Sequence, residues 1–196
     1  MVVYPQCYEL SEVLQNLENV RPLLKRLKNH DKKIHTHSLR VTAYSLDLGY
    51  ENGLEDSLYD LGVGALLHDY GKINVHRRII RKKGELTEQE LRVMKKHALE
   101  GAQLVGFNPI IRGIIQYHHA FDRRRQKKPR EQIPLDLLPH KSLIEIVAAA
   151  DMYDALISKR SYKRAMPITQ VEQILRKQYT GNQRYIDHLL TIYHSK

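Results

Sequence analysis

The sequence has a single cysteine and no long apolar run, and both features narrow what the protein can be. One cysteine, Cys7, excludes an intrachain disulfide framework and a thiolate zinc site, so any bound metal must rest on histidine and carboxylate ligands. No stretch approaches the roughly 20 consecutive apolar residues that cross a bilayer, and the N-terminus lacks the pattern of a signal peptide. We therefore expect a cytoplasmic protein without a membrane span.

Alternating strand patterns are also nearly absent, whereas apolar residues recur at spacings of three and four throughout the chain. A chain of 196 residues with 42% hydrophobic content is long enough for one well-packed domain. The sequence therefore predicts an all-α fold, with an N-terminal helical extension over residues 1–33 and one main domain over residues 34–196.

The formal net charge of +10 favours an anionic partner, but it does not select one. Many of the cations lie in short runs at 77–83 and 123–130, and such runs are usually solvated surface. A nucleotide, a nucleic acid and a lipid surface all stay open on charge alone.

Local signals place the expected helices. Thr87 and Glu90 form a capping box, and Asn108-Pro109 is typical of an N-cap followed by a first helical position. Gly49 is expected to close one helix and Gly71 another. The chain between helices is expected to form a basic connection over 73–84 and a long surface loop over 120–140. Helices are predicted over 8–28 with a break at Pro22, and over 36–48, 55–70, 87–105, 109–119, 141–158, 166–179 and 185–194.

The central motif is His68-Asp69, which places an imidazole and a carboxylate side by side. This donor pair suits iron, manganese, zinc and similar divalent cations. A lone buried histidine is more often hydrogen-bonded to a backbone carbonyl, but the adjacent aspartate favours a metal here. Further potential ligands lie on other predicted helices, so that seven side chains could build a two-metal site. They are His37 in the first turn of its helix, His97, the doublet His118-His119, and Asp151.

Asp151 and Asp154 lie three residues apart on the most apolar predicted helix. Burying carboxylates in such a helix is costly unless cations or metals partner them. We assign Asp151 as a metal ligand and Asp154 as a hydrogen-bonding residue behind the ligands.

These residues resemble the ligand series of the HD superfamily of metal-dependent phosphohydrolases, and specifically its HD-GYP branch. The resemblance runs from about His37 to Gly181. It includes the HDxGK element ending at Lys72, Leu86-Thr87 with Glu90, and Ala150-Asp151-Met152-Tyr153-Asp154-Ala155 followed by Arg160 and Tyr162-Lys163.

The resemblance implies an HD-domain bundle of about seven or eight helices with a dinuclear metal site in its centre. In this assignment Asp69 bridges two divalent metal ions, and iron or manganese suits a histidine-rich site without cysteine. Some members use a glutamate four residues before the first histidine to reach a third metal; Lys33 stands there, which predicts two ions. The first ion would be bound by His37, His68 and Asp151, and the second by His97, His118 and His119.

The implied activity is hydrolysis of a phosphodiester by a hydroxide held between the metals. Asp69 and Lys72 would be catalytic, and Lys72, Arg160 and Lys163 would bind the phosphate of the substrate. Ordinary surface charge is the alternative for Arg160 and Lys163. The substrate class is a nucleotide, either a cyclic dinucleotide such as cyclic di-GMP or a related phosphoester.

The sequence departs from the branch in the loop that shapes the substrate pocket. Residues 118–123 read HHAFDR, Lys127-Lys128-Pro129 stands about where Gly-Tyr-Pro belongs, and the Asp-Pro expected after Gly181 is missing. In one interpretation the protein is still a phosphodiesterase that uses its basic loop to hold a polyanion. In another it is a catalytically impaired signalling module that binds a nucleotide or a protein partner. Nucleic-acid binding by residues 123–130 is less favoured, and a homodimer contact through the N-terminal helices stays open.

Overall fold

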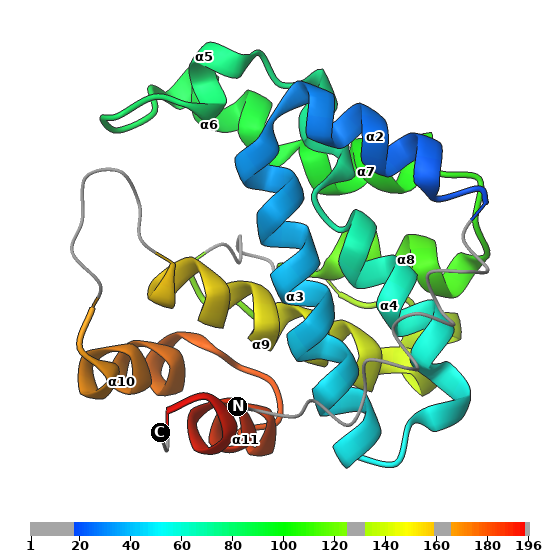
Figure 1. Cartoon of the computed structure of the whole chain (residues 1–196), viewed down its shortest axis with the longest axis vertical. Helices are drawn as coiled ribbons and strands as arrows, with labels where there is room; N and C mark the ends of the chain where they lie inside the picture. The colour runs from blue at the N-terminus through cyan, green and yellow to red at the C-terminus, as the bar shows by residue number, and fades with distance from the viewer. Residues whose placement is uncertain (1–17, 125–131, 159–165, 195–196) are drawn as a thin grey trace.

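The computed structural model describes residues 18–124, 132–158 and 166–194, which are folded largely into helices (Figure 1). Over these ranges no residue belongs to a strand, and the only β-type pairing is an isolated bridge between Asp122 and Tyr179. The expected all-α fold is confirmed. In chain order the elements are α2 (Arg21–His30), α3 (Lys32–Glu51), η1 (Glu55–Ser57), α4 (Leu58–Leu67), η2 (Tyr70–Asn74), α5 (Arg77–Ile80), α6 (Glu88–Lys95), α7 (His97–Leu104), α8 (Pro109–Tyr117), η3 (Leu135–His140), α9 (Lys141–Ile157), α10 (Ile168–Gln178) and α11 (Arg184–His194).

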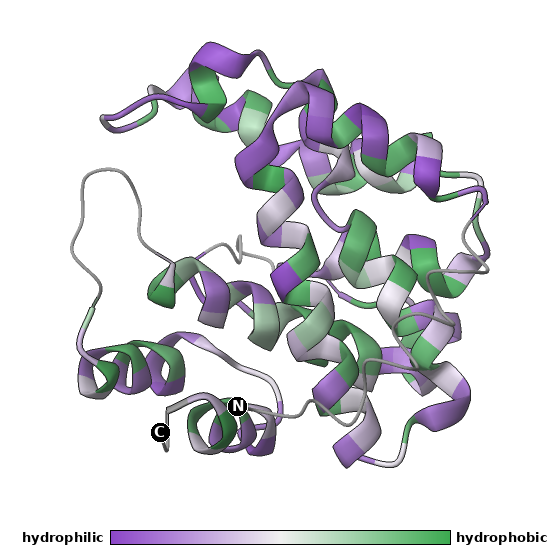
Figure 2. Cartoon of the chain, viewed as in Figure 1, coloured by the Kyte–Doolittle hydropathy of each residue, from purple (hydrophilic) through white to green (hydrophobic). Residues whose placement is uncertain are grey.

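The longest helix, α3, runs through the middle of the molecule and packs against α2, α4 and α9 (Figure 1). Apolar side chains gather in two clusters, one centred on α9 with α3, α10 and α11, and one between α2, α4, α7 and α8. In Figure 2, α2, α5 and α6 carry many hydrophilic residues, whereas α4, which is buried between the clusters, is mostly hydrophobic.

Three helices contribute to both clusters: α3, through Ile34 and Val41, and the two helices α4 and α8. Every residue from Leu61 to Leu67 of α4 is buried, with Leu61 in the first cluster and Leu66 in the second. Helix α8 is shared in the same way, through Ile114 and Ile115. The residues that follow these two helices are consequently held at fixed positions.

Short-range signals in the sequence are confirmed where they rest on caps. The capping box of Thr87 and Glu90 is formed at the start of α6, and the Asn108 side chain accepts a hydrogen bond from the Ile111 N–H at the start of α8. Helix α9 spans Lys141–Ile157, and the two closing helices also occur where they were predicted.

The predicted start of α3 is wrong by four residues. Asp31, which is 2% exposed, caps the helix by accepting hydrogen bonds from the N–H groups of Lys33 and Ile34, so α3 begins at Lys32. His37 consequently lies in the second turn and not the first.

The predicted end of α3 is also wrong, because Gly49 does not close the helix. A Cβ on Gly49 would approach the Leu61 side chain to 2.6 Å, so this glycine permits close packing of α3 on α4. The chain turns instead at Gly53, whose φ of 71° suits a residue without a side chain.

Two further predicted helices are shorter than expected. The helix expected over 55–70 is regular only to Leu67, and the helix expected over 87–105 is divided at Lys96 into α6 and α7. Gly71 packs directly against the start of α7. A Cβ at position 71 would come within 2.0 Å of the His97 carbonyl oxygen. Close contact between η2 and α7 thus explains why a glycine stands at position 71.

The connections are more ordered than predicted. The expected surface loop over 120–140 buries Phe121, Asp122 and Leu137 and contains η3, although residues 125–131 lie outside the described residues. The basic connection over 73–84 contains the short helix α5, which buries Ile79.

The N-terminal boundary at residue 33 stays a prediction. Helix α2 begins at Arg21 with Pro22 in its first turn, and the Leu27 side chain is buried in the second apolar cluster. The expected helix over residues 8–17 lies outside the described residues. Among the helices that the structure describes, none has the length and apolar character needed to cross a bilayer.

Candidate metal centre

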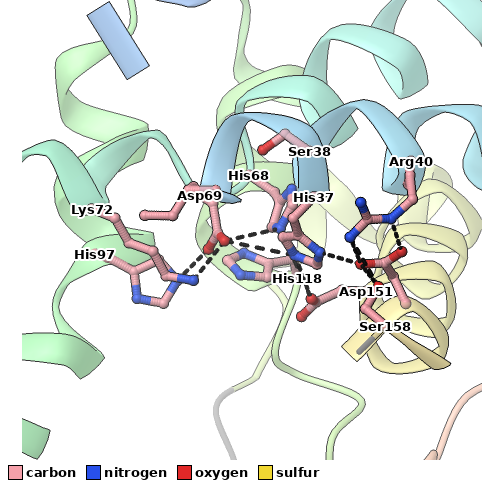
Figure 3. Close-up of polar contacts among 12 residues, drawn as sticks. His37, Ser38, Arg40, His68, Asp69, Lys72, His97, His118, Asp151 and Ser158 are labelled. Atoms are coloured by element: carbon pink, nitrogen blue, oxygen red, sulfur yellow. Dashed lines mark hydrogen bonds and ion pairs between the residues drawn. The ribbon is translucent and has the colours of Figure 1, made fainter. Parts of the chain in front are cut away.

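Five histidines and two aspartates meet where α3, α4, α7, α8 and α9 come together (Figure 3). They are His37 on α3, His68 and Asp69 after α4, His97 at the start of α7, His118 and His119 after α8, and Asp151 on α9. Potential ligand atoms lie within 4.8 Å of one another in three sets among the described residues: His37 with His68 and Asp151, His68 with Asp69 and His118, and His97 with His118 and His119.

Three of the histidines are oriented by the ends of the preceding helices. In His68, His97 and His118 the Nδ1 atom lies 2.6–2.7 Å from the carbonyl oxygen three residues earlier, in the last turn of α4, α6 or α8. A carbonyl oxygen only accepts, so Nδ1 carries the proton and Nε2 presents its lone pair to the interior. One hydrogen bond thus fixes both the tautomer and the orientation of each ring.

The Nε2 atoms of His68, His97 and His118 are buried and have no hydrogen-bond partner. Leaving one such acceptor unsatisfied costs about 1–3 kcal/mol, and three in one place need a common explanation. A cation that accepts nitrogen and oxygen ligands satisfies all three at once. The donor set therefore fits a divalent metal, and the three sets of ligand atoms define a divalent metal site.

Asp69 lies between two groups of these nitrogen atoms. Its Oδ2 atom is 3.7 Å from His37 Nε2 and 3.5 Å from His68 Nε2, and its Oδ1 atom is 3.3 Å from His97 Nε2. Ligands about 2.1 Å from one ion lie roughly 3–4 Å from one another, so these spacings suit coordination. Each oxygen of Asp69 therefore faces a different part of the histidine array.

Lys72 binds the same carboxylate, with its Nζ atom 2.5 Å from Asp69 Oδ2. Burial raises the pKa of Asp69, but neighbouring groups, first among them the Lys72 ammonium, outweigh it and hold that pKa well below its usual range. Asp69 is therefore ionised, as a metal ligand must be. The Lys72 side chain is 20% exposed, so its ammonium lies at the edge of the site.

Asp151 faces the array from α9. Its Oδ1 atom is 3.1 Å from His37 Nε2, and its Oδ2 atom is 3.7 Å from His119 Nδ1. Burial raises the pKa of Asp151, but His37 and the more distant His68 and His119 together hold it well below its usual range. A second ionised carboxylate thus enters the same cluster.

His37 is held differently from the three carbonyl-bound histidines, because its Nδ1 atom lies 2.6 Å from Oδ2 of Asp154. Burial lowers the pKa of His37, but its hydrogen bonds to Asp151 and Asp154 raise it to about 9. A cation bound at Nε2 would replace the proton that Nε2 shares with Asp151.

His118 shows the opposite shift. Burial, together with the nearby His68 and His97, lowers its pKa well below the usual value, so this imidazole is neutral. A neutral imidazole with an unpartnered Nε2 is the form that binds a metal.

All seven predicted ligands, together with Lys72 and Asp154, are brought to one place, whereas Arg160 and Lys163 lie outside the described residues. Sequence reasoning missed Arg40 and Ser158, which both bind the Asp154 carboxylate. The only available signal for Arg40 was its position one turn after His37 on the same helix.

The fold and the site together define a class of protein: an all-helical domain that gathers five histidines and two aspartates at a divalent metal site. The HD domain model matches residues 34–156, a range that holds all seven candidate ligands. This chain belongs to the HD domain family.

Relatives with assigned activities extend the comparison. A cyclic di-GMP phosphodiesterase of Thermotoga maritima is 31% identical over 173 residues, which are 83% of this chain and 42% of that protein. A cyclic di-GMP phosphodiesterase of Pseudomonas aeruginosa is 29% identical over 163 residues, 80% of this chain and 38% of that protein. A 3'3'-cGAMP-specific phosphodiesterase of Vibrio cholerae is 30% identical over 144 residues, 71% of this chain and 30% of that protein. The chain thus spans less than half the length of these relatives.

The fold is also that of a solved structure, the HD domain of the L. monocytogenes phosphodiesterase PgpH in complex with cyclic di-AMP. The two superpose with a TM-score of 0.62 at 18% identity, over 89% of this chain and 98% of that one.

Proposed function

We propose that this protein is a metal-dependent phosphodiesterase that hydrolyses a cyclic dinucleotide, with cyclic di-GMP as the first candidate. The observation that carries the proposal is the position of Asp69, whose two oxygens face separate histidines while three buried Nε2 atoms lack partners. The named activities of the relatives, all of them cyclic-dinucleotide phosphodiesterases, support the substrate class.

The proposed centre holds two divalent ions, iron or manganese, bridged by Asp69. His37, His68 and Asp151 would hold one ion, and His97, His118 and His119 the other. Two such ions lower the pKa of a water molecule and neutralise phosphoryl oxygens, the two difficulties of phosphodiester hydrolysis. Asp151, proposed for the first ion, also approaches His119, proposed for the second, which suits a centre in which the two ligand sets lie side by side.

Lys72 has the second role in this proposal. Its ammonium contacts Asp69 at the edge of the site, where a phosphoryl oxygen of the substrate would arrive. Lys72 would then share its protons between Asp69 and the phosphate and stabilise negative charge that develops during hydrolysis. Arg160 and Lys163 are proposed to bind the rest of the phosphate on the basis of sequence alone.

The test is hydrolysis of cyclic di-GMP by protein prepared without oxygen and reloaded with Fe(II) or Mn(II). Products are separated by chromatography, and 3'3'-cGAMP and cyclic di-AMP are assayed in parallel. We expect metal-dependent formation of the linear dinucleotide or the mononucleotides, and none with the Asp69→Ala variant. Turnover at the same rate in metal-free protein would contradict the proposal.

The second candidate is a signalling module that binds a nucleotide or a protein partner with little turnover. Lys127-Lys128-Pro129, in place of Gly-Tyr-Pro, is the sequence feature that favours it. Equilibrium dialysis with labelled cyclic di-GMP separates the two: retention of intact nucleotide by metal-loaded protein, without product, would select the binding module.

A further inference from the structure

His37 depends on a side chain for its orientation, unlike the three histidines whose rings contact backbone carbonyls. The rings of His68, His97 and His118 are held by backbone carbonyls, which the helices fix in space. His37 is held by the Asp154 carboxylate, and a carboxylate can rotate about its side-chain bonds. The orientation of His37 therefore requires a second group that fixes Asp154.

The structure contains such a group. Arg40 Nε lies 2.6 Å from Asp154 Oδ1, and Arg40 Nη2 lies 2.8 Å from Oδ2, so the guanidinium donates hydrogen bonds to both carboxylate oxygens (Figure 3). The Ser158 hydroxyl accepts from Arg40 Nη2 at 2.9 Å and donates to Asp154 Oδ2 at 3.1 Å. Oδ2 thus receives His37, Arg40 and Ser158 together.

Burial of the Asp154 carboxylate means that its charge needs a partner within the protein. Asp154 is 1% exposed, whereas the Arg40 side chain is 40% exposed and reaches the carboxylate from the solvent side. Arg40 is thus a cation that compensates this buried carboxylate.

We propose that Arg40 is a positioning residue for the metal centre: it fixes Asp154, which orients His37, and it thereby acts on one metal position and not on the other. The rings of His68, His97 and His118 are held by backbone carbonyls, so their orientations do not pass through Asp154. This inference rests on the proposed two-metal centre.

The fork of the guanidinium explains why an arginine is needed. Its planar geometry matches a carboxylate with two parallel hydrogen bonds, whereas a lysine ammonium is a point charge on a flexible stem. Lysine at position 40 would restore the charge without fixing the plane of the carboxylate. The Arg40→Lys variant consequently separates geometry from charge, and the Arg40→Gln variant removes the charge and the fork.

The experiment is a Mn(II) titration of the full chain, with free Mn(II) counted by its electron paramagnetic resonance signal and bound ions resolved into affinity classes by calorimetry. We expect two ions per chain in the wild type. In Arg40→Gln and Arg40→Lys one ion should keep its affinity, while the other should be weakened about tenfold or more, the usual effect of losing such a partner. When metal is limiting, the paramagnetic resonance of bound Mn(II) in the wild type should be that of a coupled pair of ions. In the two variants it should be that of a single ion.

Arg81→Gln is the matched control. Arg81 also binds a buried aspartate, with its Nε atom 2.8 Å from Asp31 Oδ2, but Asp31 contacts no metal-site histidine. This variant should lose stability by a similar amount and still bind both ions as the wild type does. Circular dichroism at the titration temperature confirms that each variant is folded.

Three results would overturn the inference. These are wild-type affinity for both ions in Arg40→Gln, equal weakening of both ions in a folded variant, and full recovery by Arg40→Lys. A wild type that binds fewer than two ions would instead contradict the proposed two-metal centre. Arg40 is then judged on the single affinity, which should still fall in Arg40→Gln and stay unchanged in Arg81→Gln.

Discussion

At the scale of single residues, the assignment of each imidazole nitrogen decides what the cluster can do. His68, His97 and His118 each satisfy a helix-end carbonyl with Nδ1 and leave Nε2 facing the interior. Each ring thus serves two purposes: it donates to a carbonyl in the last helical turn, which needs a donor, and it holds Nε2 in a fixed orientation. Ligand orientation is therefore a by-product of helix termination.

Lys72 provides a prediction at the same scale. Replacing it by methionine keeps the length of the stem but removes the ammonium that contacts Asp69 at 2.5 Å. We expect the turnover number for cyclic di-GMP to fall about 100-fold, as with the loss of one transition-state donor, while metal content stays near that of the wild type. Steady-state kinetics combined with metal analysis of the same sample measures both quantities.

Lys82 gives the control for this variant, because its Nζ atom also binds a carboxylate, that of Glu90, away from the histidine cluster. Lys82→Met should leave turnover unchanged. An equal loss in both variants, or loss of the metal in Lys72→Met, would exclude the proposed phosphate-binding role of Lys72.

The seven residues that cluster could be singled out from the sequence because they match the ligand series of the family. Arg40 and Ser158 could not, because their role arises only when α3 packs against α9. No spacing within one helix shows that Arg40 meets Asp154, which is 114 positions away. Partners of ligands are thus harder to predict than the ligands themselves.

At the scale of elements, glycine positions show where two segments approach closely. The nearest atoms to a Cβ on Gly71 would be the His97 carbonyl oxygen at 2.0 Å and the Gly101 nitrogen at 2.6 Å, both of them backbone atoms that cannot move aside cheaply. We expect Gly71→Ala to lower the free energy of unfolding by about 3 kcal/mol and to displace the HDxGK segment, so metal affinity should fall as well. Denaturant titration and metal binding measure the two effects.

Gly84 is the matched control, since a Cβ there would meet no atom within 4 Å. Gly84→Ala should change the stability by less than about 0.5 kcal/mol. If the two variants had the same free energy of unfolding, η2 and α7 would not lie as close together as described.

Asp31 carries a second prediction for an element, because it caps α3 and binds Arg81. Asp31→Ala should cost about 1–2 kcal/mol of stability, the usual value of a lost N-cap, while Asp31→Asn should retain most of the cap. Thermal or urea unfolding of the two variants measures the difference. Equal losses in both would show that the ion pair with Arg81, and not the cap, is what stabilises this end of α3.

The pH dependence of this cap has a defined sign. Burial raises the pKa of Asp31, but Arg81 and the N–H groups of Lys33 and Ile34 lower it overall below 3.8. A lowered pKa contributes stability that is present above the unfolded value of about 3.9 and is lost as the pH falls through the folded value. The stability difference between wild type and Asp31→Asn should therefore shrink below about pH 4.

The boundaries of the elements were predicted least well, for physical reasons that these residues illustrate. Thr87 and Asn108 act on N–H groups within three positions, so the start of α6 and of α8 can be read locally. The role of Gly71 depends on contact between η2 and α7, which no local pattern reports.

At the scale of the whole molecule, the metal site joins parts of the chain that are far apart in sequence. Its candidate ligands come from α3, α9, the start of α7 and the ends of α4 and α8, and α3, α4 and α8 belong to both apolar clusters. Without a cation, three buried nitrogen atoms lack partners and two ionised carboxylates lie close together. A metal at this place therefore stabilises contacts between five helices at once.

Removal of metal should accordingly lower stability without abolishing the fold, because the two apolar clusters are built from residues other than the candidate ligands. Ligand binding stabilises a folded protein by RT ln(1 + [L]/Kd), which is about 4 kcal/mol when free metal is 1,000 times the dissociation constant. We expect a chelator to lower the melting temperature of wild-type protein while unfolding stays cooperative, and to have no effect on Asp69→Ala, which lacks the carboxylate proposed to bridge the ions. Differential scanning calorimetry with and without chelator, over a series of free Mn(II) concentrations, measures the shift and its dependence on metal. A wild-type melting temperature that does not change with metal concentration would mean that the unpartnered nitrogens of His68, His97 and His118 are satisfied in some other way, and the metal centre would then have to be abandoned.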